Sequence, residues 1–149
     1  MSNRLEGKVA IIIGAGCVGP GWGNGRATAF RFVEEGAKVF AVDNSESALI
    51  ETIERVNTLD GTMETFIGDA TKSQSVADMI KACVNKFGRL DILVNNVGGS
   101  KKGGPVELSE EDWDSQVDCN LKSVFLSCKH ALPELEKGGG GVIVNIAST

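Results

Sequence analysis

The chain has 149 residues, of which 42% are hydrophobic and 23% charged, and this predicts one globular domain over residues 1–149 with a substantial core. Its 15 basic and 20 acidic side chains give a net charge of −5, and the scattered basic residues argue against nucleic acid or an anionic membrane surface as the main partner. No apolar run approaches the roughly 18–20 residues of a membrane span, and residues 1–8 lack the apolar core of a signal peptide.

Residues 8–35 contain an apolar run, a glycine-rich segment and a helical pattern in succession. Val9–Ile13 has the composition of a strand buried on both faces of a parallel sheet. Residues 14–25 include six glycines, and residues 26–35 return to helical spacing. A strand, a glycine turn and a helix in this order aim backbone N–H groups and the helix dipole at a phosphate. We therefore predict a nucleotide pyrophosphate site here, the alternative being a glycine-rich surface turn that binds nothing.

The glycine spacing differs from that of a simple dinucleotide fingerprint. Gly14, Gly16 and Gly19 match it loosely, but no helix begins directly after them. Residues 17–22 therefore form an insertion that enlarges the loop, in which Trp22 either packs the loop down or covers the cofactor. The predicted cofactor-binding residues of this loop are Gly14, Gly16, Cys17, Gly23, Asn24 and Gly25.

A second short strand, residues 38–42, is followed by Asp43. An acidic residue at the end of the second strand of a dinucleotide-binding unit accepts hydrogen bonds from the adenosine ribose hydroxyls. Asp43 lies 18 residues after Gly25, near the expected interval of about 20. Because a carboxylate repels a 2′-phosphate, Asp43 predicts NAD in preference to NADP. The alternative is a carboxylate that caps the next helix.

The remaining elements alternate between helix and strand. They are expected at residues 45–59 (helix), 63–67 (strand), 73–87 (helix), 90–94 (strand), 110–132 (helix) and 142–146 (strand). In the long helix we expect an inward apolar stripe that contains Trp113 as a core anchor and is shared by Asn120. We expect Pro133 to end or kink this helix.

Five buried strands that alternate with helices predict an α/β fold, a doubly wound parallel sheet of the Rossmann type with strand order 3-2-1-4-5. Right-handed crossovers place the first two helices on one face and the next two on the other. A ligand then binds between strands one and four. Asp43, Asp69, Asn96 and Ser148 would all lie at this carboxyl edge.

The four cysteines form no Cys-x-x-Cys pair and no Cys/His ligand spacing. We expect reduced cysteines, no metal site and a cytoplasmic location.

Taken together, these segments resemble the short-chain dehydrogenase/reductase family over the whole chain. The glycine motif corresponds to Ile13-Gly14 and Gly23-Asn24-Gly25, interrupted by the insertion and with Ile in place of Thr. The other family motifs correspond to Asp69-Ala70, Asn95-Asn96-Val97-Gly98, Asn120 and Asn145-Ile146-Ala147-Ser148, with Val97 in place of Ala.

The resemblance implies a role for each matched residue. Asp69 and Ala70 would contact the adenine, and Asn96, Val97 and Gly98 would bind the cofactor. Ser148 would hydrogen-bond the substrate oxygen and Asn120 would hold a water in the proton relay. The implied reaction is hydride transfer between nicotinamide and an alcohol or ketone, by a homodimer or homotetramer.

The sequence contains no Tyr, whereas the family uses a Tyr-x-x-x-Lys motif after the Ser to exchange the proton. We expect the chain to be the N-terminal part of a longer enzyme, ending before the later strands, and to be inactive alone. We also expect one face over the fourth and fifth strands to be bare. Two alternatives are an S-adenosylmethionine-dependent methyltransferase, which also has a glycine turn and an acid ending the second strand, and a non-catalytic nucleotide-binding module.

Overall fold

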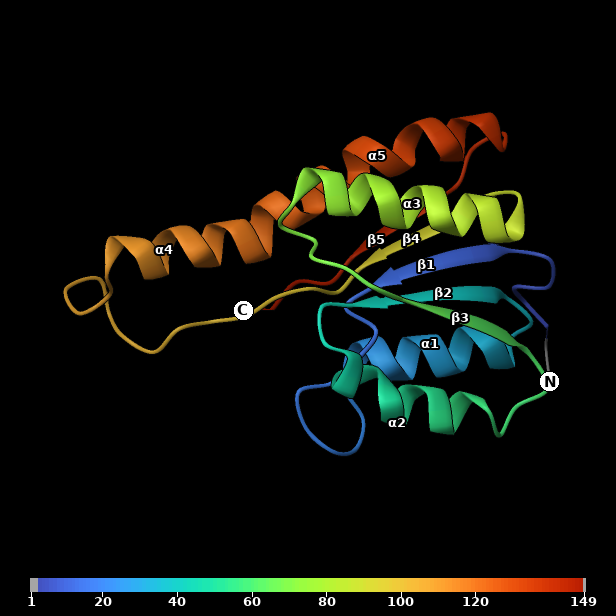
Figure 1. Ribbon diagram of the computed structural model, residues 1–149, viewed down its shortest axis with the longest axis horizontal. Coiled ribbons are helices and arrows are strands. Elements are labelled where there is room, and N and C mark those ends of the chain that lie inside the picture. The colour runs from blue at the N-terminus through green and yellow to red at the C-terminus, as the bar shows by residue number, and fades with distance from the viewer. Residues whose placement is uncertain (1–2, 149) are drawn as a thin grey trace.

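The computed structural model describes residues 3–148 and shows strands and helices that alternate along the chain (Figure 1). The elements are β1 (Val9–Ile13), α1 (Asn24–Glu34), β2 (Lys38–Asp43), α2 (Glu46–Val56), β3 (Thr62–Ile67), α3 (Ser73–Phe87), β4 (Ile92–Asn95), α4 (Glu110–Val117), the π-helical segment η1 (Asp118–Lys122), α5 (Ser123–Lys137) and β5 (Val142–Asn145).

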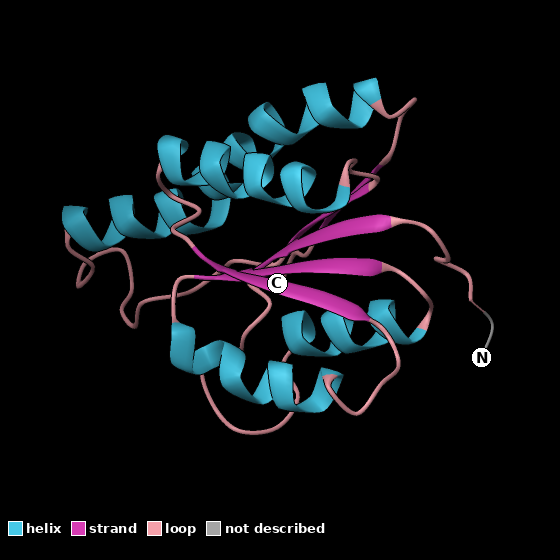
Figure 2. Cartoon of the chain, turned by 45° about the vertical axis from the view of Figure 1, so that its right-hand side comes forward, coloured by secondary structure: helices cyan, strands magenta, loops and turns pink. Residues whose placement is uncertain are grey.

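The five strands form one parallel sheet in the order β3-β2-β1-β4-β5, which confirms the predicted topology. Helices α1 and α2 cover one face, and α3 and α5 cover the other (Figures 1 and 2). Ile13 at the end of β1 is in register with Val42 on one side and Asn95 on the other. The carboxyl ends of β1, β2 and β4 therefore meet at the predicted switch point.

The core consists of two apolar layers, one on each face of the sheet. Ile11 and Ile13 of β1 belong to the layer under α3 and α5, whereas Ala10 and Ile12 belong to the layer under α1 and α2. All five residues of β1 are buried, because alternate side chains of a central strand enter opposite layers. Each fully buried aliphatic side chain contributes about 1.5–3 kcal/mol to folding.

Local signals account for several helix ends. The Ser45 hydroxyl accepts a hydrogen bond from Ala48 N (3.3 Å), and the Ser109 hydroxyl accepts one from Asp112 N (3.1 Å), so each Ser caps the helix that follows it. Gly88 ends α3 in the left-handed conformation, with φ of 82°.

The region predicted as one helix over residues 110–132 is α4, η1 and α5 in succession, and it continues through Pro133 to Lys137. The predicted inward stripe is wrong for most of its residues: Trp113 is 61% exposed, Leu121 67% and Phe125 61%, and Asn120 is exposed as well, whereas Cys128 further along the stripe packs against the core. Helix α4 projects beyond the sheet (Figure 1), so no core lies beneath its apolar side. In α5 the buried residues are Ser123, Leu126, Ser127, Ala131 and Leu135.

Strand β5 forms an edge of the sheet with one face uncovered. Val142 is 55% exposed and Val144 is 38% exposed. The same face of β4 is covered, because Ile92 and Val94 pack in the layer under α1 and α2. The expected bare face thus extends over β5 and not over β4.

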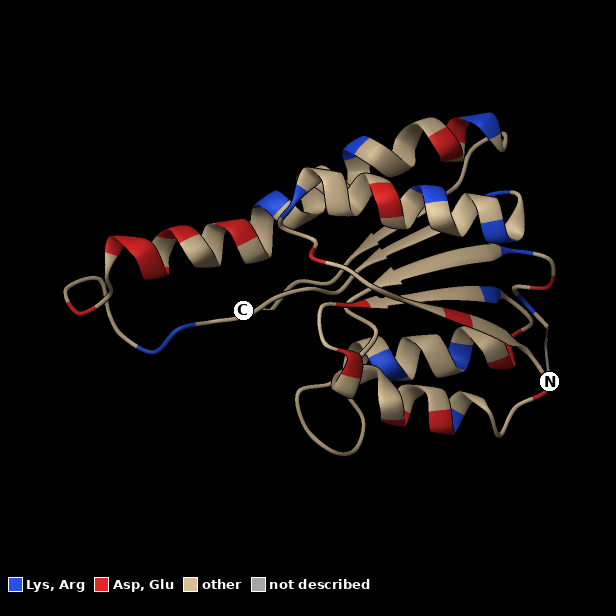
Figure 3. Cartoon of the chain, viewed as in Figure 1, with Lys and Arg blue, Asp and Glu red and all other residues tan. Residues whose placement is uncertain are grey.

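Charged side chains are spread over both helical layers, and the acidic residues at the start of α4 form the densest group (Figure 3). Within residues 3–148, no helix combines the length and apolar composition that a bilayer crossing requires.

Candidate functional site

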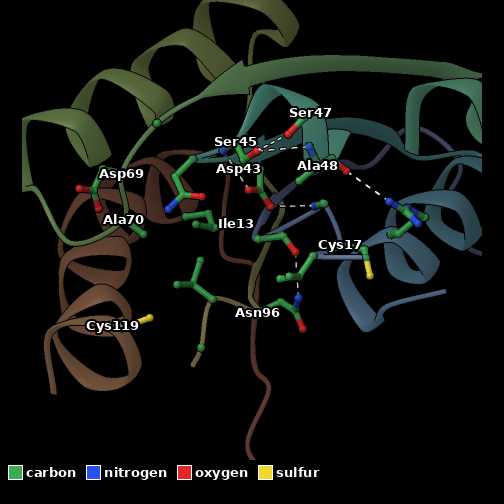
Figure 4. A pocket seen from close by; sticks show the side chains of 18 of the residues that line it. Ile13, Cys17, Asp43, Ser45, Ser47, Ala48, Asp69, Ala70, Asn96 and Cys119 are labelled. Atoms are coloured by element: carbon green, nitrogen blue, oxygen red, sulfur yellow. Dashed lines mark hydrogen bonds between the residues drawn. The ribbon is translucent and has the colours of Figure 1, made fainter. Parts of the chain in front are cut away.

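A cavity of about 830 Å³ lies at the carboxyl ends of the strands. Its walls come from the loop after β1, the ends of β2 and β3, the start of α2 and the loop after β4. Figure 4 shows Asp69 and Ala70 on one side and Cys17 and Ala48 on the other, with Asp43 between them. Both the volume and the position at the switch point are typical of a cofactor site in an α/β fold.

Most of the predicted cofactor-binding residues line this cavity: Gly14, Gly16, Cys17, Asp43, Asp69, Ala70, Asn96, Val97 and Gly98. The others lie outside its wall. These are Gly23, Asn24 and Gly25, at the start of α1. The two predicted catalytic residues are not part of the wall either: Asn120 lies in the π-helical segment, and exposed Ser148 follows β5.

The turn after β1 is closed by contacts that only glycine permits. Gly14 has φ of 89°, and its carbonyl oxygen accepts a hydrogen bond from Asn96 Nδ2 (2.8 Å). A Cβ atom on Gly25 would lie 1.8 Å from that same oxygen. The backbone N–H of Asn96 also donates to Ile13 O (2.9 Å), so the ends of β1 and β4 and the start of α1 are fastened together.

Asp43 presents its carboxylate to the cavity from the end of β2. Oδ2 accepts a hydrogen bond from Gly16 N (2.9 Å), and Oδ1 accepts one from Ser45 N (3.1 Å). A Cβ atom on Gly16 would lie 2.7 Å from Asp43 Oδ2, so glycine is needed for this approach. The side chain that caps α2 is Ser45 and not Asp43. Asp43 instead connects the loop after β1, through Gly16, to the loop before α2, through Ser45.

Asp69 organises the loop after β3. Its Oδ1 accepts hydrogen bonds from Thr71 N (2.8 Å) and Thr71 Oγ1 (2.7 Å). Burial, the largest single influence, would raise the pKa of Asp69, but the Thr71 hydrogen bonds and the positive charges of Lys72 and Lys122 together hold it below its usual range. The carboxylate is thus ionised beside Ala70, which is 5% exposed.

Asn120 connects the π-helical segment to the loop after β4. Its Oδ1 accepts from Gly99 N (3.0 Å), and its Nδ2 donates to Gly99 O (2.8 Å) and Gln116 O (2.8 Å). The side chain therefore positions the loop that follows Val97 and Gly98. π-Helical turns within α-helices occur frequently at functional sites.

The sequence analysis missed several residues of the cavity wall. Arg26, Ser47, Glu51, Thr71 and Cys119 line it, although none was predicted as a site residue. The one sequence signal for Arg26 is its position directly after Gly25, the last glycine of the loop. Burial, with a contribution from the charge of Asp69, raises the pKa of the Cys119 thiol.

Comparisons with known proteins agree with this geometry. A family model for the short-chain dehydrogenases matches residues 8–149. An uncharacterized oxidoreductase of Thermotoga maritima is 43% identical over 145 residues, which cover 97% of this chain and 55% of the relative.

Two solved structures extend the comparison. A crystal structure from Burkholderia xenovorans, described as a short-chain dehydrogenase/reductase, superposes with a TM-score of 0.95 at 53% identity, over 98% of this chain and 58% of that one. A 7α-hydroxysteroid dehydrogenase in complex with NADH and 7-oxo glycochenodeoxycholic acid superposes with a TM-score of 0.88 at 34% identity, over 99% of this chain and 55% of that one.

The chain thus spans a little over half the length of these relatives. The family-model match covers residues 8–149 of this chain, a range that contains the glycine turn and the motif residues at the carboxyl edge of the sheet. The chain belongs to the short-chain dehydrogenase/reductase family.

Proposed function

We propose that this protein is an oxidoreductase that transfers a hydride between C4 of the nicotinamide of NAD and a small alcohol or ketone substrate. The observation that carries the proposal is the cavity at the switch point, whose wall contains Gly14, Asp43 and Asn96. Family membership supports the reaction class, and the NADH complex of the hydroxysteroid dehydrogenase supports the type of cofactor.

The preference for NAD over NADP rests on Asp43. Its carboxylate lies at the end of β2, where the adenosine ribose binds in dinucleotide-binding folds. A 2′-phosphate placed there would meet a negative charge in a partly desolvated cavity, and this repulsion favours the free 2′-hydroxyl of NAD.

The cofactor supplies the hydride acceptor or donor, and the residues of this chain bind and orient the reactants. Gly14, Gly16, Cys17 and the start of α1 would hold the pyrophosphate, and the loops at Asp69–Ala70 and Asn96–Gly98 would hold the adenine and the nicotinamide half. Ser148 would donate a hydrogen bond to the substrate oxygen, and Asn120 would support the proton relay.

The proton itself requires a group outside these 149 residues, because the family resemblance assigns this role to a Tyr and the sequence has none. We therefore propose that the 149 residues alone do not turn over substrate. We also propose a cytoplasmic homodimer or homotetramer, in which the exposed apolar stripe of α4, η1 and α5 (Trp113, Leu121, Phe125) packs against a second copy.

The test compares the Kd values of NADH and NADPH for the full-length protein and its Asp43→Ser variant, followed by a hydride-transfer assay with secondary alcohols and ketones. We expect the unaltered protein to bind NADH at least tenfold more tightly than NADPH, and Asp43→Ser to remove most of that difference. Binding of S-adenosylmethionine in place of NADH would support a methyltransferase. NADH binding without any hydride transfer would support a non-catalytic nucleotide-binding module.

A further inference from the structure

The enlarged part of the glycine-rich loop is fastened to α2, the helix that follows Asp43. Arg26, which is 2% exposed, lies under the loop and donates through Nη1 to the carbonyl oxygens of Gly21 and Gly19. The same Nη1 contacts Glu51 Oε2 on α2 at 2.6 Å. Arg26 Nε donates a hydrogen bond to Thr52 Oγ1 (3.2 Å), and Nη2 donates one to Ala48 O (3.3 Å), both on α2.

Glu51 contacts Arg26, the loop backbone and Arg55 at the same time. Besides the Arg26 contact, its carboxylate accepts a hydrogen bond from Gly21 N (3.3 Å) and two from Arg55, at 2.9 and 2.6 Å. Arg55 in turn lies over the ring of Trp22, with its Cζ 4.2 Å from the ring centroid. The same carboxylate thus holds two neighbouring loop residues, Gly21 directly and Trp22 through Arg55.

Trp22 has a second contact that keeps it against the protein. Its ring meets Phe30 of α1 edge-on, with centroids 5.4 Å apart. Trp22 is not among the residues of the cavity wall, and its contacts with Phe30 and Arg55 favour the alternative in which it packs the widened loop down. We call Trp22, Arg26, Glu51 and Arg55 the loop clasp.

The loop clasp adjoins the proposed adenosine end of the cavity. Loop residues Gly16, Cys17 and Val18 line the cavity together with Arg26 and Glu51, beside Asp43. Val18 is fully exposed, and a glycine-rich segment loses much conformational entropy when it is ordered. A loop of this composition therefore needs contacts outside itself to hold a single conformation before a ligand arrives.

We propose that Glu51 is a positioning residue for the cofactor, which holds the enlarged glycine-rich loop as a preformed wall of the adenosine site through Arg26, Gly21 and Arg55. The proposal rests on the proposed function, because it assumes that an adenine dinucleotide occupies this cavity. Glu51 is decisive because it is the carboxylate paired with Arg26: the Glu51 side chain is 28% exposed, but Arg26 is buried, and removal of the carboxylate leaves its guanidinium without an anionic partner. Without Glu51, part of the binding free energy of the cofactor is spent on ordering the loop, and the affinity falls.

The experiment uses a Trp113→Phe background of the full-length protein, in which Trp22 is the remaining Trp of residues 1–149. In this background, Glu51→Gln is expected to increase acrylamide quenching of the Trp22 fluorescence. The Kd values of NADH and of ADP-ribose are expected to rise by the same factor, about tenfold, because the loop faces the adenosine and pyrophosphate groups that the two ligands share. Any further Trp of the full-length protein is replaced by Phe as well.

Glu54→Gln is the matched control, since Glu54 is an exposed carboxylate on the same helix. It should leave both Kd values and the Trp22 quenching unchanged. If Glu51→Gln does not fold by circular dichroism, Arg55→Gln serves instead: it removes the contact with Trp22, keeps the Arg26–Glu51 pair, and should raise quenching with a smaller loss of affinity.

Equal NADH affinity of the Glu51→Gln and Glu54→Gln variants would overturn the positioning role while leaving the proposed function intact. A loss of NADH affinity without a matching loss for ADP-ribose would overturn it too, since the effect would then lie outside the adenosine site. If the unaltered protein binds neither ligand, the proposed function fails and this proposal fails with it.

Discussion

Substitution of Gly25 by Ala tests the closest approach in the turn after β1. The added methyl group would lie 1.8 Å from Gly14 O, whereas ordinary contacts begin at 3.4 Å, so the two groups must separate by 1.6 Å. Gly14 O also accepts the hydrogen bond from Asn96 Nδ2 (2.8 Å), and this movement breaks it. Overpacking costs about 1–3 kcal/mol and the hydrogen bond about 0.5–1.5 kcal/mol. Alanine recovers about 0.5–1 kcal/mol through its higher helix propensity.

We therefore expect Gly25→Ala to lower the free energy of unfolding by about 2 kcal/mol, a large part of the roughly 5–15 kcal/mol of a typical domain. Urea titration of the full-length protein measures this change. Gly19→Ala is the control, since a Cβ atom there meets nothing within 4 Å, and it should change stability by less than about 0.5 kcal/mol. Equal stability of the two variants would show that the contact between α1 and the Gly14 carbonyl is not tight.

Two further predictions concern ionisable groups. Burial raises the pKa of Cys83 to about 12. Iodoacetamide at pH 8 should therefore label the partly exposed Cys17 of the native protein and leave Cys83 unlabelled, as measured by mass spectrometry. Similar labelling rates for both thiols would contradict the buried position of Cys83. Because the pKa of Asp69 is depressed on folding, its ionisation stabilises the protein above the ordinary Asp value of about 3.9 and this stability is lost as pH falls through the lower folded value. Asp69→Asn should therefore be less stable than the unaltered protein at pH 7 and approach it in acid, and a stability difference that does not vary with pH would refute this.

The ends of most elements follow from the sequence because β1, β2, β4 and β5 each contain a short apolar run that a polar or glycine residue ends, and the strand order follows from the alternation of strands with helices. The five residues Val9–Ile13 predict a central strand, and they form one. The interval between Gly25 and Asp43 correctly indicates that the extra residues lie within the loop, since both ends of the loop occupy their expected places beside β1 and α1.

The apolar stripe that begins at Trp113 shows what periodicity leaves undetermined. The spacing correctly predicts helical structure with one apolar side. The same spacing is found whether that side faces the core or faces outward, so it does not fix the direction. The direction depends on whether a sheet lies beneath the helix, and α4 extends past the sheet (Figure 1). The Arg26–Glu51 pair was missed for another reason: the residues are 25 positions apart on different helices, and no local pattern joins them.

The tight contacts around Gly14 and Gly25 also determine where related chains can differ in length. Gly14 is fastened to Asn96, Gly16 to Asp43, and Gly25 lies against the Gly14 carbonyl, so an added or deleted residue at any of these points would displace two neighbouring elements at once. The segment from Val18 to Gly21 is held instead by the side chains of Arg26 and Glu51, which can adjust to a backbone of different length. Insertions and deletions accumulated during divergence of the family should therefore fall in this segment, and its flanking glycines should keep their positions in every member that retains the turn.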